Sequence, residues 1–178
     1  DSARLRLGLQ GLTLLAWVYL VVGGFAGPPS TDDNPAPRAL YVLFWVGIVP
    51  LSLLFGPVWR LVNPLRTIHL LLAAITRIPA HRGLLPLPQR LGYWPAALSL
   101  LSFVWLELAA PNRAAVSVLL LYFTVYAAVQ LSAALLFGHR WFATGDGFEV
   151  YSTLVGTLAP VGRRDDGRLV LRNPLDGV

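Results

Sequence analysis

The sequence contains no cysteine, no methionine and no lysine, and few charged residues of any kind. Without cysteine the chain has no disulfide, no thiolate nucleophile and no cysteine-ligated metal. Charged residues make up 13% of the chain, whereas a soluble domain has about 25%. The net charge of +5 comes from arginines between apolar stretches, and no basic stripe on a soluble element indicates nucleic-acid binding. We therefore exclude a soluble globular domain, a disulfide-stabilised protein and a nucleic-acid-binding protein.

The absence of methionine also means that Asp1 is not a translation start. The first apolar segment is too long for a signal peptide and has no small-residue cleavage site. We therefore expect the chain to be a processed or internal part of a longer protein.

Four long apolar stretches dominate the sequence. A helix that crosses about 30 Å of hydrocarbon needs roughly 20 apolar residues. The stretches of about this length lie at residues 7–25, 39–59, 93–110 and 114–137. Pro50 predicts a kink in the second stretch. None of the four alternates apolar and polar residues as a membrane β-strand does. The sequence predicts an all-α integral membrane protein with four transmembrane helices.

Arginines gather at the N-terminus, between the second and third stretches, and after the fourth. By the positive-inside rule these three regions, including both termini, face the cytoplasm. The loop before residue 39 contains Asp32 and Asp33 and only one arginine, so it lies outside. The arginines that we assign to topology or lipid headgroups are Arg60, Arg66, Arg77, Arg82, Arg90 and Arg140.

The sequence repeats itself at a spacing of about 82 residues. Leu-Phe-Gly followed by tryptophan ends the second stretch at Gly56 and Trp59, and the fourth stretch at Gly138 and Trp141. A helix cap then follows in each copy: Asn63 before a proline, and Asp146 with Glu149 three residues later, which has the spacing of a capping box. We predict repeat one at residues 1–90 and repeat two at residues 91–178.

An amphipathic stretch follows each cap, at residues 63–78 and 146–158. In the second stretch, Phe148 and Leu158 share the apolar face, and Glu149 and Ser152 lie on the opposite, polar face. This pattern predicts a helix lying along the cytoplasmic membrane surface. Each repeat is then two spans plus one interfacial helix, and the two repeats are parallel. By the same pattern we expect a fifth span just beyond Val178, after a polar tail.

Polar residues inside the apolar stretches are candidates for chemistry. Glu107 is the only acidic residue within a predicted span, where it is either functional or interfacial. Tyr122, Tyr126 and Gln130 follow one another at intervals of four and form one polar helix face. Such a face either makes interhelical hydrogen bonds or lines a polar cavity.

No motif in the sequence indicates a cofactor or a metal. The three histidines, His69, His81 and His139, have neither HxH nor HExxH spacing. A glycine-rich phosphate loop and a nucleophile elbow are also missing.

The chain resembles a family of bacterial membrane proteins, common in actinobacteria, named after fenitrothion hydrolase. The motifs that carry the resemblance are Phe44-Trp45-Val46-Gly47 with Pro50, Phe55-Gly56 with Trp59-Arg60 and Asn63-Pro64, Gly92-Tyr93-Trp94-Pro95-Ala96, Trp105-Leu106-Glu107-Leu108, Gly145-Asp146 with Phe148-Glu149-Val150-Tyr151, and Leu171-Arg172-Asn173-Pro174-Leu175-Asp176-Gly177. The resemblance implies a bacterial plasma-membrane protein, a multi-subunit complex and hydrolysis of an organophosphorus triester. It assigns no catalytic residue.

Three functions remain open on the sequence. The chain is a subunit of a membrane hydrolase, a transporter or carrier of an apolar or anionic solute, or a scaffold that only packs and anchors. In each case its partners are the lipid bilayer and further transmembrane helices of the parent chain or of other subunits.

Overall fold

The computed structural model describes residues 2–163, 169–171 and 173. Within them, three helices are long and apolar enough to cross a membrane: Arg4–Ala26, Pro35–Phe55 and Val116–Phe137. The first lies in α1 (Ser2–Ala26) and the third is α7 (Val116–Phe137). The apolar helix α6 (Trp94–Leu108) has 15 residues, about 22 Å, which falls short of a bilayer core. The prediction of a helical membrane protein is confirmed, whereas the fourth span is not.

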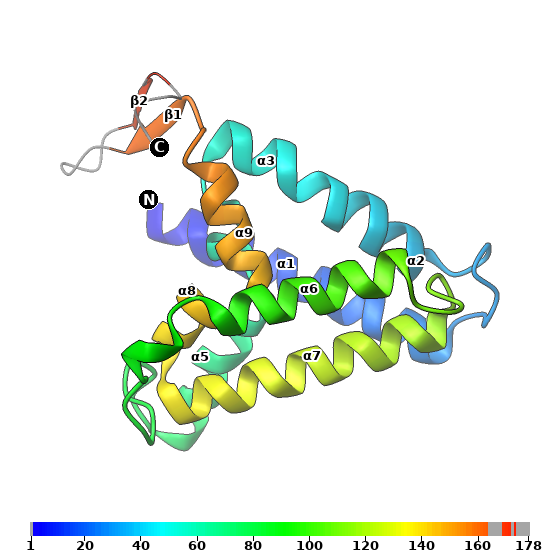
Figure 1. The fold of residues 1–178 in the computed structure, drawn as a ribbon, viewed down its shortest axis with the longest axis horizontal. Helices are drawn as coiled ribbons and strands as arrows, with labels where there is room; N and C mark the ends of the chain where they lie inside the picture. Colours follow the sequence, from blue (N-terminus) through cyan, green and yellow to red (C-terminus); the bar gives the residue numbers. More distant parts are fainter. Residues whose placement is uncertain (1, 164–168, 172, 174–178) are drawn as a thin grey trace.

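The three candidate spans and α6 run lengthwise between the same two ends of the molecule (Figure 1). The large apolar side chains of α1 are mostly exposed on the protein's outer surface, among them Leu7, Leu12 and Leu15. Exposure of a whole apolar helix is unfavourable in water and favourable in hydrocarbon. The packing therefore agrees with a lipid-facing α1.

The second span joins α2 (Pro35–Arg38), a π-helical segment η1 (Ala39–Val46) and α3 (Gly47–Phe55). The Gly47 amide donates to the Val42 carbonyl, five residues back, and also to the Phe44 carbonyl. Pro50 lies inside α3 and has no amide hydrogen, so the irregular turns precede it. The span ends at Phe55 and not at Trp59 as predicted, because Gly56 (φ 82°) and Pro57 stop the helix.

Shorter elements follow α3 and α7. After α3 come α4 (Val58–Val62) and α5 (Pro64–Thr76), then η2 (Gln89–Leu91). After α7 come η3 (His139–Trp141), α8 (Phe142–Gly145) and α9 (Gly147–Gly156). The short strands β1 (Val161–Arg163) and β2 (Leu169–Leu171) then form an antiparallel hairpin, with Gly162 opposite Val170. The sequence predicted only a polar tail there.

Helix α9 starts inside the helical bundle and not on its surface. It packs against α3, α4 and α6 (Figure 1). A Cβ atom on Gly147 would lie 2.8 Å from the Ala96 carbonyl oxygen of α6, and one on Gly156 would lie 2.8 Å from the Gly56 carbonyl carbon. Such close approach leaves no room for a side chain at either end of α9.

The burial pattern of α9 corrects the predicted interfacial helix. Glu149 and Ser152, assigned to the polar outer face, are both buried, whereas Leu158 is 40% exposed. The reason is that both polar side chains have partners inside the protein. The Ser152 hydroxyl is hydrogen-bonded to the Ser52 hydroxyl at 2.8 Å, and Glu149 is paired with Arg66. Polar groups with such partners are stable in a protein interior.

The start of α9 lies well within the length of α7. Asp146 contacts Tyr126, and Gly145 contacts Gln130. These two α7 residues come 11 and 7 positions before its last residue, Phe137, which corresponds to roughly 16 and 10 Å along the axis. The chain therefore turns back after α7 and re-enters the bundle before α9 begins.

Helix α5 begins at the same level, because Asn63 at its start is hydrogen-bonded to Asp146. It packs against α1 and α7. We call α5 and α9 the two half-helices. Their N-terminal ends meet inside the bundle.

Candidate functional site

Two of the three residues predicted as helix caps, Asn63 and Asp146, cap a helix in the structure. The Asn63 side-chain oxygen accepts from the Leu65 amide at 3.0 Å. Asp146 Oδ1 accepts from the amides of Phe148 and Glu149 at 3.0 and 3.2 Å. The caps also bind each other, since Asn63 Nδ2 donates to Asp146 Oδ2 at 2.7 Å. This contact joins the N-terminal ends of the two half-helices.

One turn into each half-helix, Arg66 faces Glu149. Arg66 Nε donates to Glu149 Oε2 and Arg66 Nη2 donates to Oε1, both at 2.6 Å. This is the two-pronged geometry that matches a guanidinium to a carboxylate. Glu149 is 1% exposed, and the Arg66 guanidinium also lies over the Phe142 ring. We call Asn63, Arg66, Asp146 and Glu149 the cap cluster.

The cap cluster corrects two predicted roles. Arg66 does not reach lipid headgroups, because its charge is buried against a carboxylate. Glu149 does not complete a capping box, because its carboxylate binds Arg66 while the Asp146 amide donates to the Phe142 carbonyl. A buried guanidinium needs a carboxylate partner, and Arg66 takes the one that the capping box would use.

The predicted polar face of α7 makes interhelical hydrogen bonds. Tyr126 donates to Asp146 Oδ1 at 2.8 Å. Gln130 donates to the Gly145 carbonyl at 3.0 Å and accepts from the Trp141 indole at 2.6 Å. Tyr122, at the next position along the face, is hydrogen-bonded to the Ser102 hydroxyl of α6 at 2.8 Å. The two deeper residues thus hold the re-entrant chain against α7.

None of the hydrogen-bond donors to Asp146 is a cation. Those donors are the Tyr126 hydroxyl, the Asn63 amide and two backbone amides. Burial raises the pKa of Asp146, the hydrogen bond from Tyr126 opposes that rise, and the nearby charge of Glu149 adds to it. The half-helix N-termini add favourable dipoles for an anion here.

Two histidines lie next to the cap cluster, on the side of Phe142. The Nδ1 atoms of His69 and His139 are 3.3 Å apart and their rings are stacked. Burial lowers the pKa of His69, and the charge of Arg66 lowers it further. Burial, followed by the charge of Arg66, lowers the pKa of His139 to about 4. Both rings are therefore neutral near pH 7, and one Nδ1–H donates to the other ring.

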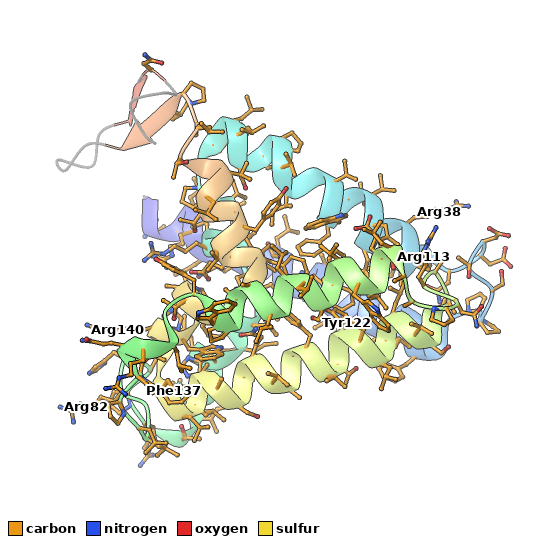
Figure 2. The ribbon with its side chains drawn as sticks, in the orientation of Figure 1. Arg38, Arg82, Arg113, Tyr122, Phe137 and Arg140 are labelled. Atoms are coloured by element: carbon orange, nitrogen blue, oxygen red, sulfur yellow. The ribbon has the colours of Figure 1, made fainter. Side chains whose placement is uncertain are left out.

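The remaining predicted residues lie away from the cap cluster. Glu107 is half-buried in α6, and within the described residues the only ion pair is that of Arg66, so Glu107 does not pair with Arg113. The other assigned arginines are exposed: Arg60, Arg77, Arg82, Arg90 and Arg140. Figure 2 shows Arg82 and Arg140 at one end of the molecule and Arg38 and Arg113 at the other.

An apolar cavity of about 380 Å³ lies beside the cap cluster, between α1, α5 and α7. Tyr126 and Phe148 border both the cavity and the caps. Trp59 also lines the cavity, and its indole nitrogen is the one buried side-chain polar atom without a hydrogen-bond partner in the described part of the chain. In that part, no group of three or more acidic or histidine side chains is placed to hold a metal ion.

Comparison with known proteins gives no match to any family, curated protein or solved structure.

Proposed function

We propose that this chain is the membrane-embedded part of a proton-linked carrier, a protein that opens alternately to the two sides of the membrane. The observation that carries the proposal is the meeting of two half-helices at a buried ionic cluster. Discontinuous helices with buried N-termini form the binding sites of many transporters. Buried ionisable groups between membrane helices mark ion and proton pathways.

Asp146 is the group that takes the proton in this proposal. As a carboxylate it accepts four hydrogen bonds and holds α9, Asn63 and Tyr126 together. Once protonated, one of its oxygens becomes a donor and repels the donors that now point at it. Protonation therefore weakens the contact between the half-helices, and the raised pKa brings that step closer to neutral pH.

The solute of this carrier is an apolar or anionic molecule, the same two classes that the sequence leaves open. The cavity between α1, α5 and α7 supports an apolar solute because its lining is almost entirely apolar.

A hydrolase acting on an apolar phosphotriester is the second candidate. The same cavity beside Asp146 and the family resemblance support it. Turnover of fenitrothion by the purified parent complex, lost on Asp146→Asn, tests it.

The proposal also includes two related repeats and an orientation of the chain in the membrane. Gly56 and Gly138 have φ, ψ of 82°, −155° and 78°, 179°, and the caps Asn63 and Asp146 have ψ of 113° and 111°. These similar angles at matching positions support two related repeats at residues 1–90 and 91–178. We place the protein in a bacterial plasma membrane with both ends of this chain in the cytoplasm, supported by the arginine distribution.

The test uses the absence of cysteine, which lets a single cysteine report alone. Ser52→Cys puts a thiol where α3 contacts α9, at a position that is fully buried. In vesicles, a carrier should allow a membrane-impermeant maleimide to label this thiol. The labelling rate is divided by that of free cysteine at the same pH, because thiol reactivity itself falls as the pH drops. This ratio should be higher at pH 5 than at pH 8. Adding Asp146→Asn should remove the pH dependence, while the control Glu107→Gln should keep it. A thiol that stays unlabelled at every pH would refute the carrier and leave the scaffold.

A further inference from the structure

The apolar cavity opens toward the hydrocarbon of the membrane. Its α1 side includes Val18 and Val22, which are 50% and 56% exposed on the outer surface of the protein. Its inner end is closed by Trp59 and Phe148, which are buried. At about 380 Å³ the cavity is within the usual size range of ligand sites. A ligand that reaches it from the bilayer is apolar in the part that enters.

The ring of Trp59 closes the inner end of the cavity. Trp59 is 6% exposed, and its Nε1 is buried without a hydrogen-bond partner among the described residues. Because that nitrogen is covered by protein atoms, a molecule in the cavity contacts the apolar part of the indole and not its N–H. The inner end of the cavity therefore suits hydrocarbon.

Two exposed arginines, Arg6 and Arg60, lie on helices that line the cavity. Arg60 follows Trp59 in α4, and α1, which carries Arg6, packs against α4 and α5. Both arginines are exposed, and neither forms an ion pair with any described residue. Burial is the largest cause of the lowered pKa of His139, and the charges of Arg66 and His69 follow. The charges of Arg6 and Arg60 lower the same pKa further, so these two guanidinium groups act on one region of the protein. Arg66 itself is neutralised by Glu149.

The distances suit one membrane lipid. Arg6 precedes Leu14, the first α1 residue that lines the cavity, by eight positions, which is about 12 Å along the helix. One bilayer leaflet is about 20 Å thick with its headgroups. A lipid with its phosphate at the arginines therefore has an acyl chain long enough to enter the cavity.

We propose that the cavity binds one acyl chain of an anionic phospholipid, with its phosphate at Arg6 and Arg60. The occupant is anionic because these two cations form no ion pair with a described residue, and it is a lipid because the cavity opens to the bilayer. The lipid occupies the cavity that the proposed function assigns to an apolar solute, but its binding does not depend on the proton-linked role of Asp146.

Tryptophan quenching by brominated acyl chains tests the proposal, since Trp17 and Trp59 both line the cavity. The full chain in detergent is titrated with brominated phosphatidylglycerol and with brominated phosphatidylcholine. Saturable quenching at lower concentration by phosphatidylglycerol is expected. Equal quenching by the two lipids would overturn the anionic assignment. Displacement of phosphatidylglycerol by millimolar inorganic phosphate alone would show a free-anion site and overturn the lipid.

Substitutions of the two arginines test whether they bind the lipid phosphate. Arg6→Gln with Arg60→Gln should weaken phosphatidylglycerol binding about 25-fold, from the usual contribution of two membrane-facing arginines. The matched control, Arg77→Gln with Arg82→Gln, removes the same charge from exposed positions elsewhere and should leave affinity unchanged. Unchanged affinity in the first pair, or an equal loss in the control pair, would refute the site.

Discussion

Replacing Glu149 by glutamine keeps the shape of the side chain and removes its charge. Arg66 then keeps a buried guanidinium with no anion beside it, because the pair is 1% and 9% exposed and no other described side chain forms an ion pair with it. Breaking a buried pair in this way costs about 3–5 kcal/mol. We expect Glu149→Gln to lower the free energy of unfolding by that amount.

The assay is reversible unfolding by sodium dodecyl sulfate in mixed micelles, followed by tryptophan fluorescence. The control Glu107→Gln removes a half-buried carboxylate that forms no described ion pair, and it should change stability by less than about 1 kcal/mol. The double variant Arg66→Met with Glu149→Leu removes both charges and should recover most of the loss, since apolar replacement of a whole buried pair is often near neutral.

The double variant also separates structure from function. If the cap cluster serves only to hold the half-helices together, the double variant behaves as the unmodified chain in every assay. A cost below about 1 kcal/mol for Glu149→Gln would refute the reasoning, because that is the range of a solvent-exposed pair.

Further predictions concern single groups. Gly138→Ala should destabilise the chain by about 1–3 kcal/mol, because its φ of 78° with ψ of 179° is a glycine conformation and the added Cβ would lie 3.0 Å from the Gly83 amide; thermal unfolding in detergent measures it. Tyr126→Phe should cost about 1–3 kcal/mol in the same assay by leaving Asp146 one donor short. As the pH drops from about 6.5 to about 4, His139 should lower the stability of the folded chain, because the unfolded chain binds a proton there that the folded chain does not; the raised pKa of Asp146 acts in the opposite direction. His139→Gln should remove the contribution of His139, and an unchanged dependence of stability on pH would contradict the assignment.

Features that depend on local sequence were predictable. The lengths of the apolar stretches predicted membrane-spanning helices, and the residue types at Asn63 and Asp146 predicted the two helix caps. A cap needs only its own residue and the next two or three amides. A cap of this kind occurs both in helices on a membrane surface and in helices inside a bundle. The capping residues alone therefore could not predict how deep in the protein the two caps lie.

The pairing between the half-helices depends on tertiary contacts. Glu107 was singled out because it lies in an apolar stretch, yet the deeply buried carboxylates are Asp146 and Glu149. One available signal was the predicted repeat. Aligning its two proposed copies sets Asn63 against Asp146 and Arg66 against Glu149, so that opposite charges occupy matching positions. Complementary charges at matched sites of a repeat are a reason to expect contact.

The π-helical segment Ala39–Val46 changes which side chains of the second span share a face. A π-helical turn carries about one residue more than an α-helical turn, and each residue of a helix turns by about 100°. The outer part of the span, which begins at the Asn34 cap, is therefore rotated relative to α3 compared with an unbroken α-helix of the same residues. The face of the outer part is then set independently of the face by which α3 packs against α9.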